Sequence, residues 1–184
     1  MADIQNKTIL GNMLYNEKKI FIEHYGETEY ERILSCIKDS EASSILKGAL
    51  ISQNYYPLKA HVGFLRAVEK EYGRENLKNI IEKLAEAQVS GLYGLLIKFI
   101  SFATVAMKAN KMWKKQFETG NIKVNISDTK IIIHLKNYET EEIHAFAACV
   151  WMKRFIEIIE KTTIRKYFFK FIDKSSIDFI YEME

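Results

Sequence analysis

Residues 141–161, EEIHAFAACVWMKRFIEIIEK, decide the fold of this 184-residue chain. Glu141 and Glu142 place negative charge in the first turn of a predicted helix, where the helix dipole favours it, and Thr140 is the expected N-cap. Apolar side chains cover more than half of the circumference: Ile143, Phe146, Ala147, Val150, Trp151, Phe155, Ile158 and Ile159. A stripe this wide predicts a helix that is buried on two sides.

Four short runs flank this helix and alternate between apolar and polar residues, as strands do. NIKVNI begins at Asn121 and KIIIHLK at Lys130, and after the helix IRKYFFKFI begins at Ile164 and SIDFIYEM at Ser176. Short turn segments join each pair, so we predict a ββαββ unit with a mainly antiparallel sheet. Its predicted inner face includes one residue from each strand: Val124, Ile133, Phe169 and Phe179.

The first 118 residues instead follow the apolar period of helices, and we predict six of them. Gly26 and Gly73 end the first and the fourth, and Pro57 opens the fourth. The predicted spans are about 7–24, a short helix after Thr28, one from Ser40, one from Pro57, 75–86, and a long helix over 89–117 that ends before Gly120. The fold class is therefore α+β.

Composition predicts a single domain over 1–184, with a helical subregion 1–118 and a ββαββ subregion 119–184. The chain has one proline, no linker-like run and a net charge of only +3, which favours no particular partner. Its two cysteines, Cys36 and Cys149, are far apart on apolar helix faces, which favours free thiols and a cytoplasmic location. No apolar run is long enough to predict a membrane span.

The layout of the whole chain resembles the heme-NO-binding (H-NOX) domain, whose core is shared with TRAPP vesicle-transport subunits, which act in Golgi transport. It is closest in layout to a myxobacterial family of uncharacterised proteins. HYGETEYERIL resembles the G-x-x-x-W-x-x-I-L segment that opens several of these domains, with Tyr30 in place of the aromatic residue. NYYPLKAHVGFL is similar to the W-Y-P segment of the uncharacterised family, and KYFFKFIDKSSIDFIYEM resembles the closing hairpin.

The departures from this family concern heme. The resemblance implies a heme-binding histidine on the helix before the first strand, but residues 89–117 contain no histidine. It also implies a Tyr-x-Ser-x-Arg motif for the heme carboxylates, and the matching positions hold Leu135, Asn137 and Glu139. Because the ligand and its polar support are both missing, we expect no heme and no other cofactor.

Other chemistry finds little support. The histidines are scattered, so we expect no metal site, and nucleophile-elbow, P-loop and dinucleotide motifs are absent. Lys108, Lys111 and Lys115 share a helix face that we interpret as solvated, so we expect no nucleic-acid partner. We expect no catalytic residues and no enzyme activity.

Two functional hypotheses remain. The first is a non-catalytic sensory or regulatory domain, active in signalling, that binds a small apolar ligand between helices and sheet. Its candidate binding residues are His144, Trp151, Trp113 and Tyr138, although aromatic residues also pack ordinary cores. The second is a self-associating interaction or scaffold module without a ligand. We expect a homodimer through the predicted helix 89–117, which is apolar on many sides, with Phe99 and Phe102 as test positions.

Overall fold

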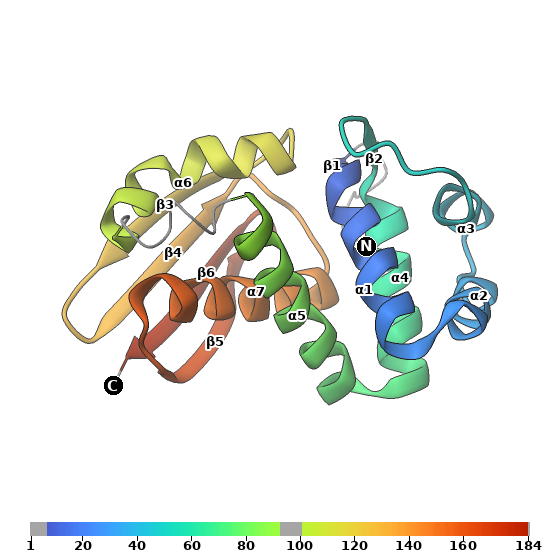
Figure 1. Ribbon diagram of the computed structural model, residues 1–184. Coiled ribbons are helices and arrows are strands. Elements are labelled where there is room, and N and C mark those ends of the chain that lie inside the picture. Colours follow the sequence, from blue (N-terminus) through green and yellow to red (C-terminus); the bar gives the residue numbers. More distant parts are fainter. Residues whose placement is uncertain (1–6, 93–100, 184) are drawn as a thin grey trace.

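The structure is a computed structural model that describes residues 7–92 and 101–183. Its helical half contains two short strands and five helices: β1 (Thr8–Leu10), α1 (Gly11–Tyr25), α2 (Glu27–Ser35), α3 (Ser40–Lys47), β2 (Tyr55–Pro57), α4 (Leu58–Tyr72) and α5 (Arg74–Leu92). The other half follows in the chain: α6 (Phe102–Gln116), β3 (Asn121–Ile126), β4 (Lys130–Lys136), α7 (Glu142–Glu160), β5 (Ile164–Asp173) and β6 (Ser176–Met183). Figure 1 shows α1 to α4 on one side, the sheet on the other, and α5 and α7 between them.

The four-stranded sheet has the order β3-β4-β6-β5, and all neighbouring pairs are antiparallel. Its register aligns four residues in one row across the strands: Val124, Ile133, Phe179 and Phe169. Ile133 and Phe179 are buried, and the other two pack against the core. The predicted ββαββ unit and its inner face are therefore confirmed, and the α+β class with them.

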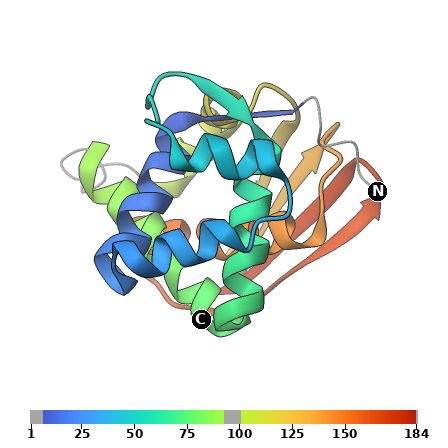
Figure 2. The ribbon, with the colours of Figure 1, turned by 90° about the vertical axis from the view of Figure 1, so that its right-hand side faces the viewer.

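Helix α7 begins and ends within one residue of the predicted span 141–161. It packs against β5 and β6 on one side and against α5 and α4 on the other, so it is buried on two sides as its wide apolar stripe predicts. In the view of Figure 2, the helical half lies in front of the sheet. The N-cap differs from the prediction: Glu141 occupies that position, and the Thr140 hydroxyl lies against His144 instead.

The predicted long helix over 89–117 is wrong. Residues 89–92 belong to α5, which begins at Arg74. Helix α6 begins separately at Phe102, because the preceding residue, Ser101, has extended backbone angles. The Ser101 side chain accepts the Thr104 backbone N–H, so Ser101 is the N-cap of a new helix. The apolar period continues across this break, which is why periodicity alone did not reveal it.

Only part of the surface expected to mediate a homodimer lies within the described residues. Phe102 is only 4% exposed within one chain, where it belongs to the hydrophobic core, while Phe99 lies outside the described residues. Met107, farther along α6, is 80% exposed. Apart from Met107 and Ala103, the exposed residues of α6 are polar and include Lys108, Lys111, Lys114 and Lys115.

The strands β1 and β2 are absent from the sequence-based prediction. They pair antiparallel, with Ile9 opposite Tyr56, and Leu58 N–H donates to the Lys7 carbonyl at 2.7 Å. Ile9 also forms a bridge with Phe117, just after α6. Ile9 is fully buried, and through these two pairings it connects the helical half to the other half. Within the described residues, no helix combines the length and apolarity that crossing a membrane requires.

Candidate functional site

Four buried rings meet where the helical half contacts the other half, and we call them the junction cluster: Trp113, Phe117, Tyr138 and His144. Trp113 stacks on Phe117 with ring centroids 4.2 Å apart, and Tyr138 stands edge-on to Trp113 at 5.2 Å. The His144 ring lies 5.6 Å from Phe117 and 5.7 Å from Tyr138. These separations are typical of directly packed aromatic rings, so the rings fill the space that they enclose.

Local backbone structure brings the cluster together. Gly120 lies in the turn that leads from α6 into β3. Its φ is 87°, a backbone conformation that residues other than glycine rarely adopt. A Cβ atom at Gly120 would lie 2.8 Å from the Trp113 Nε1 and 3.0 Å from a Tyr138 ring carbon. The Trp113 indole N–H donates to the Thr119 carbonyl at 2.8 Å. The turn and the indole ring therefore fix each other.

A chain of buried polar side chains extends from the cluster into the helical half. The Thr140 hydroxyl and His144 Nδ1 are 2.8 Å apart, and the His144 ring meets the His61 ring edge-on at 5.1 Å. His61 Nδ1 in turn lies 2.6 Å from Oε1 of Glu17 on α1. This last contact has ion-pair distance without the angles of a hydrogen bond. The distance establishes the two groups as direct neighbours.

Burial determines the charge state of the cluster. Burial first, and then the nearby His61 and Lys7, hold the pKa of His144 well below its usual range, so this imidazole is neutral at pH 7. Burial raises the pKa of Tyr138 well above its usual range, and its hydroxyl has no hydrogen-bond partner among the described residues. Lys7 lies 5.0 Å from the centre of the Tyr138 ring and donates to the Glu139 carbonyl. The cluster is thus an uncharged group of packed rings with the Lys7 ammonium beside it.

The structure brings together three of the four candidate residues predicted from the sequence: Trp113, Tyr138 and His144. Trp151 lies apart, because its indole N–H donates to Gln88 of α5 at 2.9 Å and its ring stacks on Phe155. Sequence reasoning did not include Phe117 or Glu17. A signal for Glu17 exists, because it lies between Leu14 and Phe21 on the apolar face of α1.

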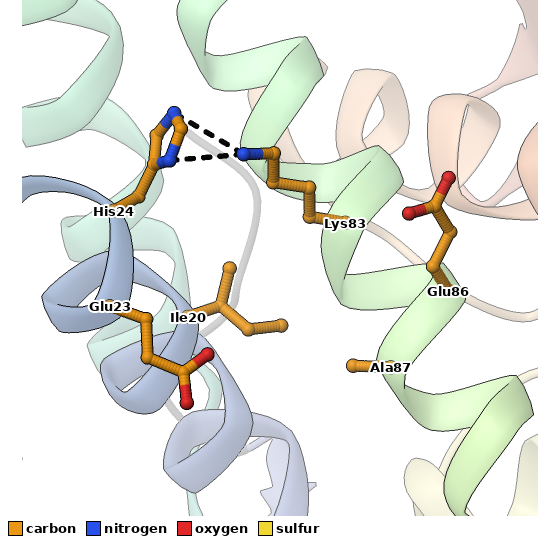
Figure 3. Close-up of a pocket in the computed structure, with 6 residues that line it drawn as sticks. All are labelled: Ile20, Glu23, His24, Lys83, Glu86 and Ala87. Carbon is orange, nitrogen blue, oxygen red and sulfur yellow. Dashed lines mark hydrogen bonds between the residues drawn. The ribbon is translucent and has the colours of Figure 1, made fainter.

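An open groove of about 410 Å³ lies between α1 and α5 (Figure 3). In it Lys83 Nζ approaches His24 Nδ1 to 3.0 Å. The groove is lined mainly by exposed side chains: Ile20, Glu23, His24, Lys83, Glu86 and Ala87. Charges of both signs are mixed there, and Glu86 pairs with Arg154 of α7. The groove therefore offers no concentrated charge or apolar surface for a particular ligand.

Other reactive groups are engaged in packing. Burial raises the pKa of the Cys149 thiol to about 12, and the Tyr181 hydroxyl donates to the Cys149 carbonyl at 3.2 Å. On the outer face of the sheet, His134 Nδ1 lies 2.7 Å from Asp178 Oδ1. Across residues 7–92 and 101–183, no three His, Cys, Asp or Glu side chains gather in a way that could hold a metal ion.

Comparison with known proteins shows the class of fold. No family model matches the sequence, and no curated protein matches it significantly. Solved H-NOX structures match almost the whole chain. An H-NOX protein from K. algicida, in the Fe(II) unliganded state, is 11% identical over 96% of this chain and 97% of its own, with a TM-score of 0.64. A variant H-NOX from T. tengcongensis is 9% identical over 96% and 98%, with a TM-score of 0.63.

A third H-NOX protein, from S. oneidensis, is 11% identical over 96% of each chain with a TM-score of 0.62. The chain therefore has the H-NOX-like fold, as the resemblance of its layout implies. At this level of identity the match concerns the fold. Whether the chain fits a heme depends on the residues present at the junction.

The residues present do not fit a heme held in the manner that the resemblance implies. Helix α6 carries no histidine, and directly packed rings occupy the junction. The two buried imidazoles, His61 and His144, face each other, with Glu17 and Thr140 as their polar neighbours. A flat macrocycle would require the rings to separate and one histidine to leave its partner.

Proposed function

We propose that the chain is a non-catalytic sensory or regulatory domain that binds a small apolar ligand at the junction cluster. The observation that carries this proposal is the buried, unpartnered hydroxyl of Tyr138 within a group of aromatic rings. Buried polar groups are nearly always hydrogen-bonded, so a buried hydroxyl without a partner calls for an explanation, and a bound molecule with a polar atom would supply one. An apolar site with few polar groups is the usual composition of a small-molecule pocket.

Ring spacing limits the size of this ligand. Because the four rings contact one another directly, a guest enters only by displacing a side chain, and the smallest displacement favours a molecule about the size of one ring. The Tyr138 hydroxyl favours a molecule with one polar atom, such as a short alcohol or a phenol. The shared fold supports the sensory class, since H-NOX proteins are the structural neighbours.

Native mass spectrometry of the protein as purified, beside a denatured control, tests the proposal directly. We expect a mass excess of one small molecule that disappears on denaturation. Titration with phenol and 1-hexanol, followed by Trp113 fluorescence in a Trp151→Phe background, then locates the site, because the chain has two tryptophans. Tyr138→Phe should weaken binding of both probes while preserving the fold. Binding unaffected by Tyr138→Phe would contradict the proposed site.

The interaction module is the second candidate, and the edge strand β5 favours it. Three apolar side chains in its middle and second half are exposed: Phe168, Phe171 and Ile172. This strand carries lysines and has register shifts at both of its ends, and both features limit pairing with a strand of another chain. The exposed edge therefore supports an interaction module less strongly than the junction cluster supports ligand binding. A homodimer without any bound small molecule in the native mass spectrum would favour this candidate.

The two free thiols support the proposed cytoplasmic location.

A further inference from the structure

Three ionisable side chains from three helices meet inside the protein: Glu17 of α1, His61 of α4 and His144 of α7. We call them the buried triad. Each is more than nine-tenths buried. The triad crosses the contact between the helical half and α7, so its charge state acts on how the two halves pack. It needs no ligand.

The triad contains a single carboxylate, and it lies beside only one of the two imidazoles. Oε1 of Glu17 is 2.6 Å from Nδ1 of His61. The nearest polar neighbour of His144 is the neutral Thr140 hydroxyl. A proton on His144 would therefore place a positive charge in a buried site without a counterion.

We propose that the buried triad is a proton-responsive latch, which docks α7 against α1 and α4 while His144 is neutral and releases α7 when His144 binds a proton. The proton comes from solvent and binds a ring nitrogen of His144. The resulting imidazolium faces the His61 ring edge-on, and the only carboxylate of the triad lies against His61 instead.

The charged and titratable groups around the triad do not offset the charge of this imidazolium. Lys7, from the segment before β1, adds to the repulsion that His144 experiences. The phenols of Tyr138 and of Tyr30 on α2 are kept neutral, because burial raises the pKa of both. At the start of α7, Glu141 and Glu142 are paired with basic side chains of the helical half, Arg66 and Arg74.

The direction of the pH effect follows from proton binding. The pKa of His144 is depressed in the folded state, so below about pH 6.5, the ordinary pKa of histidine, the unfolded or opened chain binds a proton that the docked chain does not. Stability of the docked state is therefore full above about pH 6.5 and falls as the pH drops below it. For one such group, the docking constant falls about 30-fold between pH 8 and pH 5.

Urea unfolding of the ligand-free full chain at pH 8, 7, 6 and 5 measures this loss. The variant His144→Gln keeps a hydrogen-bonding side chain but does not titrate. Between pH 8 and pH 5, the folding constant of wild type should therefore fall about 30-fold more than that of His144→Gln. His24→Gln is the matched control, because His24 is an exposed imidazole outside the triad. It should keep the wild-type pH dependence. An equal pH dependence in His144→Gln and wild type would overturn the latch.

Hydrogen exchange of the wild-type protein gives a second readout that does not depend on whether a variant folds. Protection factors, corrected for the intrinsic pH dependence of exchange, are compared at pH 7.5 and pH 5.5. The latch predicts a loss of protection around His61 in α4 and around His144 in α7, while the paired strands β4 and β6 keep theirs. Unchanged protection in both helices, or an equal loss throughout the sheet, would contradict local release of α7.

Discussion

The carboxylate of Glu160, at the C-terminal end of α7, accepts the backbone N–H of Phe102, the first residue of α6, at 2.6 Å. A side chain from one helix thus satisfies a free N–H at the beginning of another, where the helix dipole also favours negative charge. Together with the Ser101 cap, this contact determines where α6 begins.

We therefore expect Glu160→Ala to destabilise the protein by about 1 kcal/mol, which is typical for loss of a helix cap. Urea unfolding measures this change. Glu23→Ala removes another exposed carboxylate, whose partner Lys19 lies on the same helix, and should change stability by less than about 0.5 kcal/mol. Equal effects of the two substitutions would show that the Glu160 contact does not stabilise α6.

Gly120→Ala should be more destabilising than Gly26→Ala. Both glycines have positive φ, so each alanine costs about 1–3 kcal/mol of backbone strain. At Gly26 a Cβ atom meets nothing within 4 Å, whereas at Gly120 it meets the Trp113 ring. Chemical denaturation gives the two stabilities, and Trp113 fluorescence in a Trp151→Phe background should change only with Gly120→Ala. The opposite order of stabilities would contradict the tight turn beside the junction cluster.

Phe102→Lys should unfold the chain, because it places an unpaired charge in the core at a cost of about 3–5 kcal/mol. Met107→Lys, on the exposed side of the same helix, should be nearly neutral. Circular dichroism reports folding, and light scattering of the wild type reports the oligomeric state. A folded, monomeric Phe102→Lys variant of a dimeric wild type would restore this face as an interface.

Thiol labelling should distinguish the two cysteines. Native protein at pH 8 is expected to react at Cys36, which is partly exposed, and to leave Cys149 unmodified, because the Cys149 thiol is buried and stays protonated. A chromogenic disulfide reagent should count about one thiol per native chain and two after denaturation. Rapid labelling of Cys149 in the native protein would show that α7 opens away from the sheet at neutral pH.

Protein purified from heme-supplemented cells should be colourless, without Soret absorption. The physical reason is the absence of a histidine on α6 and the direct packing of the junction rings. Stoichiometric heme would contradict this prediction and would point to His61 or His144 as the iron ligand. In that case His61→Gln and His144→Gln, compared with His24→Gln, would identify which histidine binds.

Much of this fold is predictable because its signals are local. Alternation places Val124 and Ile133 on one sheet face, and Gly26 and Gly73 end their helices with φ of 89° and 82°. The break at Ser101 was missed because it depends on Glu160, far away in the sequence. The strand β1 was missed because it has only three residues and continues directly into α1.

The candidate site shows the same division. Aromatic residues near the predicted junction suggested Trp113, Tyr138 and His144, and the structure places them together. The contact between His61 and His144 joins two helices whose sequences contain no common motif, so only the folded chain reveals it. Trp151 satisfies the same residue-type criterion but lies about two helical turns beyond His144 along α7, where Gln88 of α5 accepts its indole N–H.

The pairing of Ile9 with two segments has a consequence for when the chain folds during its synthesis. Ile9 contacts Tyr56 within the helical half and Phe117 at the end of α6, so one of its two neighbours is synthesised much later than the other. A nascent chain that has released only the helical half still exposes one side of this apolar strand. Contacts so distant in sequence delay folding and couple distant segments. We therefore expect the two halves to become stable together after Phe117 has left the ribosome, and the helical half expressed alone to aggregate.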